Sequence, residues 1–221
     1  MQTRQGRQGD EVQALDRGLR ALRFEPEVPR GENERVSVDW LARRFGVDLP
    51  HAERVGRIAC QILNQMGVHA KTERQGRKLQ WAAKLHEIGI QISHSDYHKH
   101  GAYILENTDM TGFTVDELHR LGLLVLGHRG KLRKLDMALS EPQFVCQLLV
   151  LRLAVILCHA RRDPQIDGLS LSLDERYQTF HLTLPKGWAA LYPQSAHLLH
   201  EESSAWQKTA WGFVVHNPEQ N

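Results

Sequence analysis

The chain has 221 residues, enough for one hydrophobic core, or for one main domain with a small appendage. Its 28 Lys and Arg against 26 Asp and Glu give a net charge of +2, so bulk charge points neither to nucleic acid nor to a membrane surface as a partner. No apolar run is long enough to span a bilayer, the first residues lack the apolar stretch of a signal peptide, and three scattered cysteines without a CxxC motif suit a reducing, cytoplasmic location.

Residues 1–35 are predicted to be a flexible linker with one short helix. Residues 1–10 are polar and rich in glycine, which is typical of disorder. The helix is indicated by apolar residues at helical spacing, namely Val12, Leu15, Leu19 and Leu22. The segment EPEVPRGENER then interrupts that pattern with two prolines and a glycine.

Residues 36–165 carry a succession of helical patterns. The first is SVDWLARRFGV, with Ser37 as N-cap and Gly46 as the terminating glycine. The second, DLPHAERVGRIACQILNQMG, has Pro50 in its first turn and an apolar stripe along one face. A third helix is predicted from Thr72 to Ile88.

Three more helices complete this predicted domain. One lies in SDYHKHGAYILEN, capped by Ser95 or Asp96. The next, TVDELHRLGLLVLGHRG, carries a capping box of Thr114 and Glu117. The last, SEPQFVCQLLVLRLAVILCHARR, has Ser140 and Pro142 at its start; it is the most apolar and is expected at the centre of the core.

The pattern changes in residues 166–221. LSLSLDERYQTFHLTLP alternates like two strands around a turn at Asp174–Glu175. QSAHLLHEESSAWQKT predicts a helix and WGFVVH a final strand. The expected fold is therefore mainly α: a helical bundle over residues 36–165, followed by a small α/β lobe over residues 166–221.

Histidines at the ends of four predicted helices are the first candidates for chemistry: His51, His86, His98 with His100, and His128. Facing helices of a bundle can build a metal site from inward side chains, and His51, the pair His86–Glu87 and His128 would form one here. Their order resembles the HD phosphohydrolases, which hold metals with an early His, a His-Asp pair and a late Asp. Glu87 stands where that superfamily has Asp, and Val155 where it has the late Asp.

Other interpretations of these histidines compete with metal binding. A valine offers no lone pair, so the site would lack a ligand. His86 is then better explained as a buried histidine that bonds within the core, and His51 as a surface histidine at a helix start. The segment HEIGI also fails the HExxH zincin motif, because Ile90 stands at the second His.

From Ser37 onward the chain resembles the C-terminal half of exopolyphosphatases and guanosine pentaphosphate phosphohydrolases. The matching segments are SVDWLARRFGVDLPHAERV, LQWAAKLHEIGIQISHSDYHKHGAYILENTDMTGF, LVLGHRGKLRK and LLRLAVIL. The resemblance implies an HD-like helical domain without metal chemistry. It also implies that catalysis and Mg²⁺ belong to an N-terminal sugar-kinase/actin-like module. We find no Gly-rich phosphate loop of that module in the chain, so we expect the chain alone to be inactive and without a cofactor.

The segment GHRGKLRK is the candidate site for a phosphate polymer. It gathers basic residues without an acid, with Lys99 and Arg120 expected nearby: His128, Arg129, Lys131, Arg133 and Lys134. A solvated basic loop is the competing interpretation. The expected ligand is polyphosphate or guanosine pentaphosphate, and a homodimer or a separate catalytic module would be a partner.

Two further functions are compatible with the sequence. The cluster His51, His86, Glu87 and His128 could serve a metal-dependent phosphohydrolase acting on a nucleotide or a (p)ppGpp-like substrate. Alternatively, the chain could be a structural partner of a catalytic module. A helix-turn-helix reader of nucleic acid is disfavoured, since Asp48 and Glu53 flank the start of its second helix.

Overall fold

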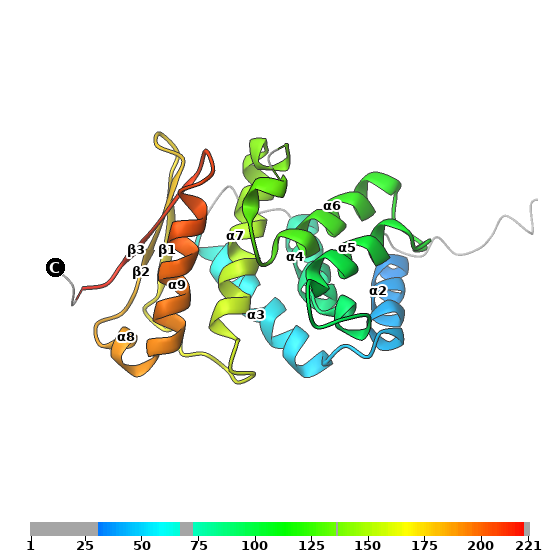
Figure 1. Cartoon of the computed structure of the whole chain (residues 1–221), viewed down its shortest axis with the longest axis horizontal. Helices are drawn as coiled ribbons and strands as arrows, with labels where there is room; N and C mark the ends of the chain where they lie inside the picture. Colours follow the sequence, from blue (N-terminus) through cyan, green and yellow to red (C-terminus); the bar gives the residue numbers. More distant parts are fainter. Residues whose placement is uncertain (1–30, 67–72, 136, 219–221) are drawn as a thin grey trace, which may run out of the picture.

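A computed structural model describes residues 31–66, 73–135 and 137–218 (Figure 1). The short helix predicted around residues 12–22, and with it most of the predicted linker, lies outside the described residues.

A helical bundle forms the larger part of the molecule. It consists of α2 (Glu32–Arg44), α3 (Leu49–Gln65), α4 (Glu73–Leu85), α5 (Tyr97–Glu106), α6 (Val115–Gly127) and α7 (Pro142–Leu157). Short 3₁₀ turns η2 (Ile88–Gln91), η3 (Leu132–Leu135) and η4 (Ala138–Ser140) lie between them. Figure 1 shows α7 between the other helices and the small lobe, and most of its residues are buried. The prediction that this apolar helix is central is thereby confirmed.

The helix ends show where the local signals succeed. Thr114 and Glu117 form the predicted capping box of α6, each side chain bonding the backbone N–H of the other. Gly46 follows α2 with a φ of +60°, the left-handed conformation that favours glycine at this position. Pro142 lies in the first turn of α7, as predicted, but the helix begins at Pro142 itself, and Ser140 lies before it in η4.

Two predicted boundaries are wrong for identifiable reasons. Helix α2 begins at Glu32, and Ser37 lies inside it, where its hydroxyl donates to the carbonyl of Thr111. The helix start is held instead by the Glu34 carboxylate, which accepts the Gly31 N–H at 2.7 Å. The third predicted helix starts at Glu73 and stops at Leu85, before His86, because the chain turns there into η2.

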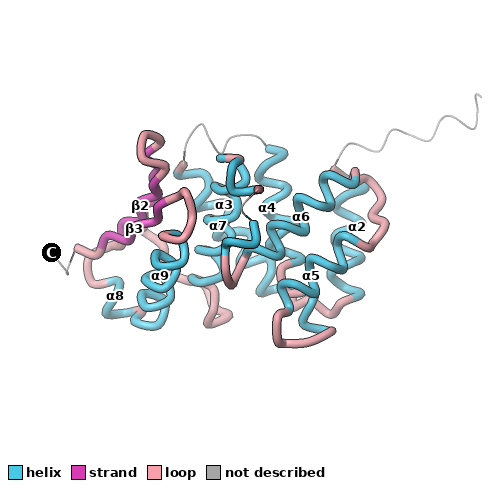
Figure 2. The backbone as a smooth tube through the Cα atoms, turned by 45° about the horizontal axis from the view of Figure 1, so that its top comes forward, coloured by secondary structure: helices cyan, strands magenta, loops and turns pink. Residues whose placement is uncertain are grey.

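The small lobe contains β1 (Ser170–Asp174), β2 (Thr179–Thr183), α8 (Trp188–Leu191), α9 (Pro193–Trp206) and β3 (Gly212–His216), as Figures 1 and 2 show. The strand order is β1-β2-β3, with β1–β2 antiparallel and β2–β3 parallel. Phe180 and Phe213 on the buried face belong to the core, and the ring of Trp206 from α9 lies 6.3 Å from that of Phe180. The predicted hairpin, helix and final strand are confirmed.

A single apolar cluster runs through both parts of the molecule. It joins Leu41 and Leu85 of the bundle to Phe180 and Trp206 of the lobe. The mainly α bundle with a small α/β lobe is therefore confirmed as the fold, while the division into domains at residues 165/166 stays a prediction. Among the described helices, none combines the length and apolarity needed to cross a membrane.

Candidate functional site

The histidines predicted to act together do converge. His51 lies in the first turn of α3, His86 directly after α4, His98 in α5 and His128 at the end of α6. The His86 ring centroid lies 5.8 Å from that of His51 and 5.1 Å from that of His128, and the His98 and His128 centroids are 6.3 Å apart. All four residues are buried.

A glycine makes this convergence geometrically feasible. A Cβ added at Gly89 in η2 would lie 2.0 Å from the carbonyl oxygen of Tyr97. Because only a glycine permits that approach, η2 can pack directly on the start of α5. This places Tyr97 beside His128, with ring centroids 5.5 Å apart.

Hydrogen bonds determine which ring nitrogen carries the proton. Nδ1 of His86 lies 2.6 Å from the Ala83 carbonyl oxygen, and Nδ1 of His128 lies 2.6 Å from the Val125 carbonyl oxygen. A carbonyl can only accept, so each Nδ1–H donates and each Nε2 keeps a lone pair. Nε2 of His86 has no described partner, whereas Nε2 of His128 is 3.4 Å from the Tyr97 hydroxyl.

Burial keeps these imidazoles neutral. It lowers the pKa of His51, His86 and His98, and lowers that of His128 well below its ordinary value. Glu87 partly opposes the effect at His51 and His86, and the neighbouring His86 adds to it at His128. The cluster therefore offers lone pairs and no positive charge at neutral pH.

Three of the predicted metal ligands approach one another closely. Ligand atoms of His51, His86 and Glu87 all lie within 4.8 Å of one another. His128, the fourth predicted ligand, meets the His86 ring edge to face but does not belong to this group of described residues. Two neutral imidazoles and a carboxylate would suit a metal such as Zn²⁺.

The carboxylate of this group is already occupied by Arg161. One guanidinium nitrogen, Nη2, lies 2.9 Å and 3.2 Å from the two Glu87 carboxylate oxygens, and Nη1 lies 2.7 Å from Asp48 Oδ2. Val155, at the position of the expected late ligand, packs half-buried against the core. The residues present therefore do not fit a divalent ion, because the only carboxylate of the group is neutralised by a side chain of the protein.

The predicted phosphate-binding segment forms the turn after α6. Leu132 and Leu135 of η3 are buried and anchor it to the core. Four exposed basic residues lie between and around them, namely Arg129, Lys131, Arg133 and Lys134; we call them the cation loop. His128 differs from the rest of the predicted set, because it is 2% exposed and held below the turn, which does not suit contact with a solvated polymer.

Most of the cation loop is without an ion pair in the part of the chain that the structure describes. No described acidic residue forms an ion pair with Arg129, Lys131 or Arg133; the Arg129 guanidinium lies 4.7 Å above the Tyr97 ring instead. Lys99 is paired with Asp96 at 2.6 Å. Desolvation and, after it, the positive charge of nearby Lys99 lower the pKa of Lys134. Arg120, also expected nearby, is instead paired with Glu141.

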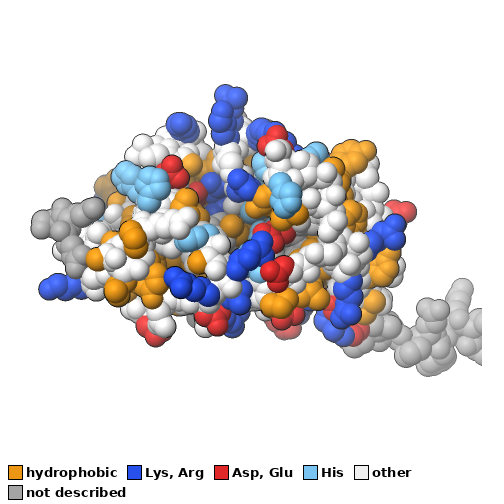
Figure 3. Space-filling view, turned by 60° about the horizontal axis from the view of Figure 1, so that its bottom comes forward, with side chains coloured by type: hydrophobic (Ala, Val, Ile, Leu, Met, Phe, Trp, Pro, Cys, Tyr) orange, Lys and Arg blue, Asp and Glu red, His pale blue; other side chains and the backbone are white. Residues whose placement is uncertain are grey.

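A cavity adjoins the cation loop. It measures about 430 Å³, and the described residues that line it include Lys131, Arg133 and Lys208 but no acid. Lys208 follows α9 and was missed by the sequence analysis, because it is 75 residues beyond Arg133 and lies in no motif. On the face that Figure 3 draws, Lys and Arg are interspersed with Asp and Glu over the middle.

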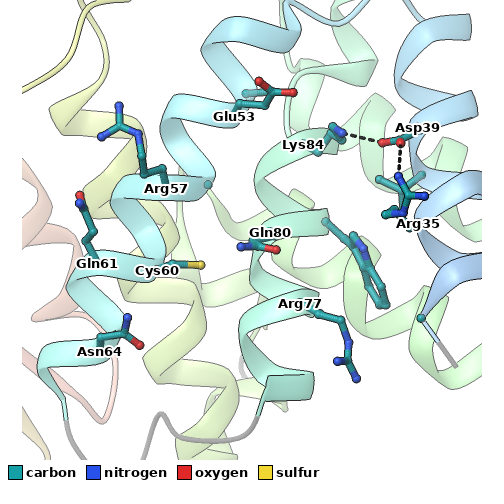
Figure 4. Close-up of a pocket in the computed structure, with 15 residues that line it drawn as sticks. Arg35, Asp39, Glu53, Arg57, Cys60, Gln61, Asn64, Arg77, Gln80 and Lys84 are labelled. Atoms are coloured by element: carbon teal, nitrogen blue, oxygen red, sulfur yellow. Dashed lines mark hydrogen bonds and ion pairs between the residues drawn. The ribbon is translucent and has the colours of Figure 1, made fainter. Parts of the chain in front are cut away.

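A second cavity lies between α2, α3 and α4, far along the chain from these residues. It measures about 500 Å³ and Figure 4 shows its lining. Three of its charged groups pair within the wall: Lys84 lies 2.5 Å from Asp39, and Arg35 lies 3.8 Å from the same carboxylate. It includes none of the predicted site residues.

The fold and these features define a helical domain with a small α/β lobe, a buried neutral histidine cluster and an exposed cation loop. The family of Ppx/GppA phosphatase domain III matches residues 34–203, and the chain belongs to this family. The guanosine-5'-triphosphate,3'-diphosphate pyrophosphatases of Aeromonas hydrophila and Vibrio atlanticus are each 36% identical to it over 79% and 91% of its length; that of Pseudoalteromonas translucida is 31% identical over 86%. The matched segments cover 36%, 41% and 39% of those three proteins, so the chain spans about two fifths of their length.

Proposed function

We propose that the chain is the polyanion-binding region of a Ppx/GppA-type phosphohydrolase and that it holds polyphosphate or guanosine pentaphosphate with the cation loop. The observation that carries this proposal is a set of exposed basic residues that form no ion pair with a described acidic residue. They lie beside a cavity whose described lining residues include no Asp or Glu. The names of the relatives, pyrophosphatases of a guanosine polyphosphate, support a ligand with several linked phosphates.

The physical basis is the difference between free and engaged cations. A guanidinium that already binds a carboxylate must give up that bond to accept a phosphate, whereas Arg129 and Arg133 form no ion pair with a described acid. Each phosphate that it neutralises also releases condensed counterions from the polymer. Binding should therefore weaken steeply with salt.

We place hydrolysis, and the Mg²⁺ that it requires, in the part of the relatives that this chain does not match. Support comes from the histidine cluster, where the Glu87 carboxylate is engaged by Arg161. Self-association and docking on a separate catalytic module are further parts of the proposal. Exposed Val36 and Trp40 on α2 offer an apolar surface for such contact, and light scattering of the chain with and without the module tests both.

Binding of labelled polyphosphate, followed by fluorescence polarisation at low and high salt, tests the proposal. The triple variant Arg129→Ala, Lys131→Ala, Arg133→Ala should lose about tenfold or more in affinity. The slope of log affinity against log salt concentration should become less steep by about 2, because each of the three lost phosphate contacts contributes roughly 0.7. Guanosine pentaphosphate as a second probe determines which ligand is preferred.

A matched control removes three cations that are paired in the structure. Arg35, Arg74 and Arg77 are bound by Glu32, Glu117 and Glu73, so replacing them with alanine changes the net charge equally. We expect this variant to retain most of the affinity. Equal losses in the two triple variants would show that only overall charge matters, and the proposed site would be wrong.

The metal-dependent phosphohydrolase remains the second candidate, because His51, His86 and Glu87 do come together. Its geometry is weaker, since Arg161 engages the carboxylate. Elemental analysis of the purified chain decides between the two. A stoichiometric metal that disappears in His86→Ala would replace the first proposal with this one.

A further inference from the structure

The guanidinium of Arg161 lies at the mouth of the histidine cluster, and its contacts are specific. It bridges Asp48, the N-cap of α3, and Glu87, the residue that follows His86. Arg161 thus joins the chain after α7 to two segments that are distant in sequence. Glu87 is only 11% exposed, so its charge is largely removed from water and needs a local partner.

The backbone at Arg161 also shows that this placement is built into the fold. Its φ is +54°, in the left-handed region that non-glycine residues adopt at some cost. Its N–H donates to the carbonyl of Cys158, directly after α7. Such a conformation persists where the surroundings determine it.

Two buried nitrogens behind Arg161 point to what the pocket could hold. Nε2 of His86 and Nδ1 of His51 have no described hydrogen-bond partner. The His86 tautomer, with Nδ1–H fixed on Ala83, is the one in which a histidine presents Nε2 to a metal. The group lacks only a free carboxylate, because Glu87 is neutralised by Arg161.

We propose that Arg161 is an internal cation that closes a latent divalent-metal site formed by His51, His86 and Glu87. The positive charge of Arg161, which is shared with Asp48, occupies Glu87, the only carboxylate among the three ligands. A divalent ion would have to approach within a few ångströms of the guanidinium and compete with it for the same oxygens. Neutralising residue 161 frees the carboxylate and leaves two imidazoles and one carboxylate, a donor set suited to Zn²⁺ or Co²⁺.

The inference does not depend on polyanion binding, and metal titration tests it. Because exposed His181 and His216 lie 2.9 Å apart, ring nitrogen to ring nitrogen, and could bind metal themselves, both are replaced by alanine in every protein compared. In that background Arg161→Ala and Arg161→Gln are titrated with Zn²⁺ by calorimetry and with Co²⁺ by absorption. We expect one site at least about tenfold tighter than in the parent, with a Co²⁺ spectrum of low coordination number.

Three matched variants sharpen the test. Arg161→Lys keeps the charge and Arg162→Ala removes the neighbouring exposed charge, so neither should gain the site. Adding His86→Ala to Arg161→Gln should abolish it. Circular dichroism identifies the folded proteins, and Arg161→Gln, which can still hydrogen-bond Glu87 and Asp48, serves if Arg161→Ala does not fold. A parent that binds the metal as tightly as the neutral variants, or a folded neutral variant that binds no better than the parent, would overturn the inference.

Discussion

The cation loop and Arg161 contain the same kinds of side chain in opposite situations. Arg129, Lys131 and Arg133 are exposed and have no described acidic partner, whereas Arg161 is bound to both Glu87 and Asp48. Arg152 goes further still: it is 4% exposed and makes two hydrogen bonds to Glu202, at 2.5 Å and 2.7 Å. The effect of a cation thus depends on its partners. Arg152 stabilises the fold, Arg161 blocks a site, and the cation loop remains free for a ligand.

The largest effect is expected where a paired cation is most deeply buried. Arg152 joins α7 to Glu202 of α9 and to the Gly127 carbonyl at the end of α6, and Glu202 also accepts from the Trp206 indole. Glu202→Ala leaves the guanidinium buried without a counter-charge, so the free energy of unfolding should fall by about 3–5 kcal/mol. Urea denaturation measures this, with exposed Glu201→Ala as control. A loss no greater than that of the control would contradict the assigned role.

The histidine cluster predicts a pH dependence of stability. Because the folded-state pKa of His86 and His128 lies below the ordinary value near 6.5, the unfolded chain binds more protons as pH falls below that value. Stability should therefore be retained above about pH 6.5 and decline toward pH 5, by up to about 1.4 kcal/mol per pH unit for each such histidine. Carboxylates affect stability at lower pH than the histidines do. Burial raises the pKa of Glu117, but its bonds and ion pairs with Arg74, Thr114 and Lys78 bring that pKa to about 2.

Denaturation of His128→Gln across this pH range isolates the effect. The variant should lose part of the slope between pH 6.5 and 5, since glutamine does not titrate. His119→Gln, at an exposed position on α6, should keep the slope of the parent. If His128→Gln and the parent ran parallel, the neutral buried histidine would not be the cause.

Arg161 should show a smaller effect on stability. Its guanidinium is 48% exposed, so solvent screens the two ion pairs, and Arg161→Ala should lower the free energy of unfolding by only about 1 kcal/mol. Arg162→Ala, without a described ion pair, should change it by less than about 0.5 kcal/mol. Urea denaturation of both variants makes the comparison. A loss as large as that of Glu202→Ala would mean that Arg161 belongs to the core of the fold.

The features that could be predicted from the sequence are those that depend on neighbouring residues. The capping box of Thr114 and Glu117, Pro142 in the first turn of α7 and the turn at Asp174–Glu175 each depend on residues within a few positions, and all three are present. The start of α2 was missed because the Glu34 carboxylate accepts the Gly31 N–H there, in place of a Ser side chain at the usual capping position.

The sequence indicated which histidines belong to the cluster and which basic residues form the cation loop, but not the residues from distant segments that contact them. The order of His51, His86 and His128 indicated a cluster, and they do converge. Arg161 lies 74 residues from Glu87, and Lys208 lies as far from the cation loop, so neither belonged to a motif or a periodic pattern. Such long-range pairs follow from packing, which spacing along a single sequence does not determine.

The cation loop should show almost no effect on stability, and this separates it most clearly from Arg161 and Arg152. Arg129→Ala, Lys131→Ala and Arg133→Ala remove exposed charges that have no described ion pair, so each should change the free energy of unfolding by about 0.5 kcal/mol or less. The cation–π contact of Arg129 with Tyr97 accounts for the largest share of any loss. Replacing Leu132 with alanine, in the same turn, should instead cost about 2–5 kcal/mol, because it is 3% exposed and anchors the turn to the core. Urea denaturation and polyphosphate binding, measured on the same variants, then distinguish the two roles within one short segment. Replacing the basic residues should weaken binding and leave the free energy of unfolding almost unchanged. Replacing Leu132 should lower the free energy of unfolding, so that this variant unfolds at urea concentrations where the parent is still native.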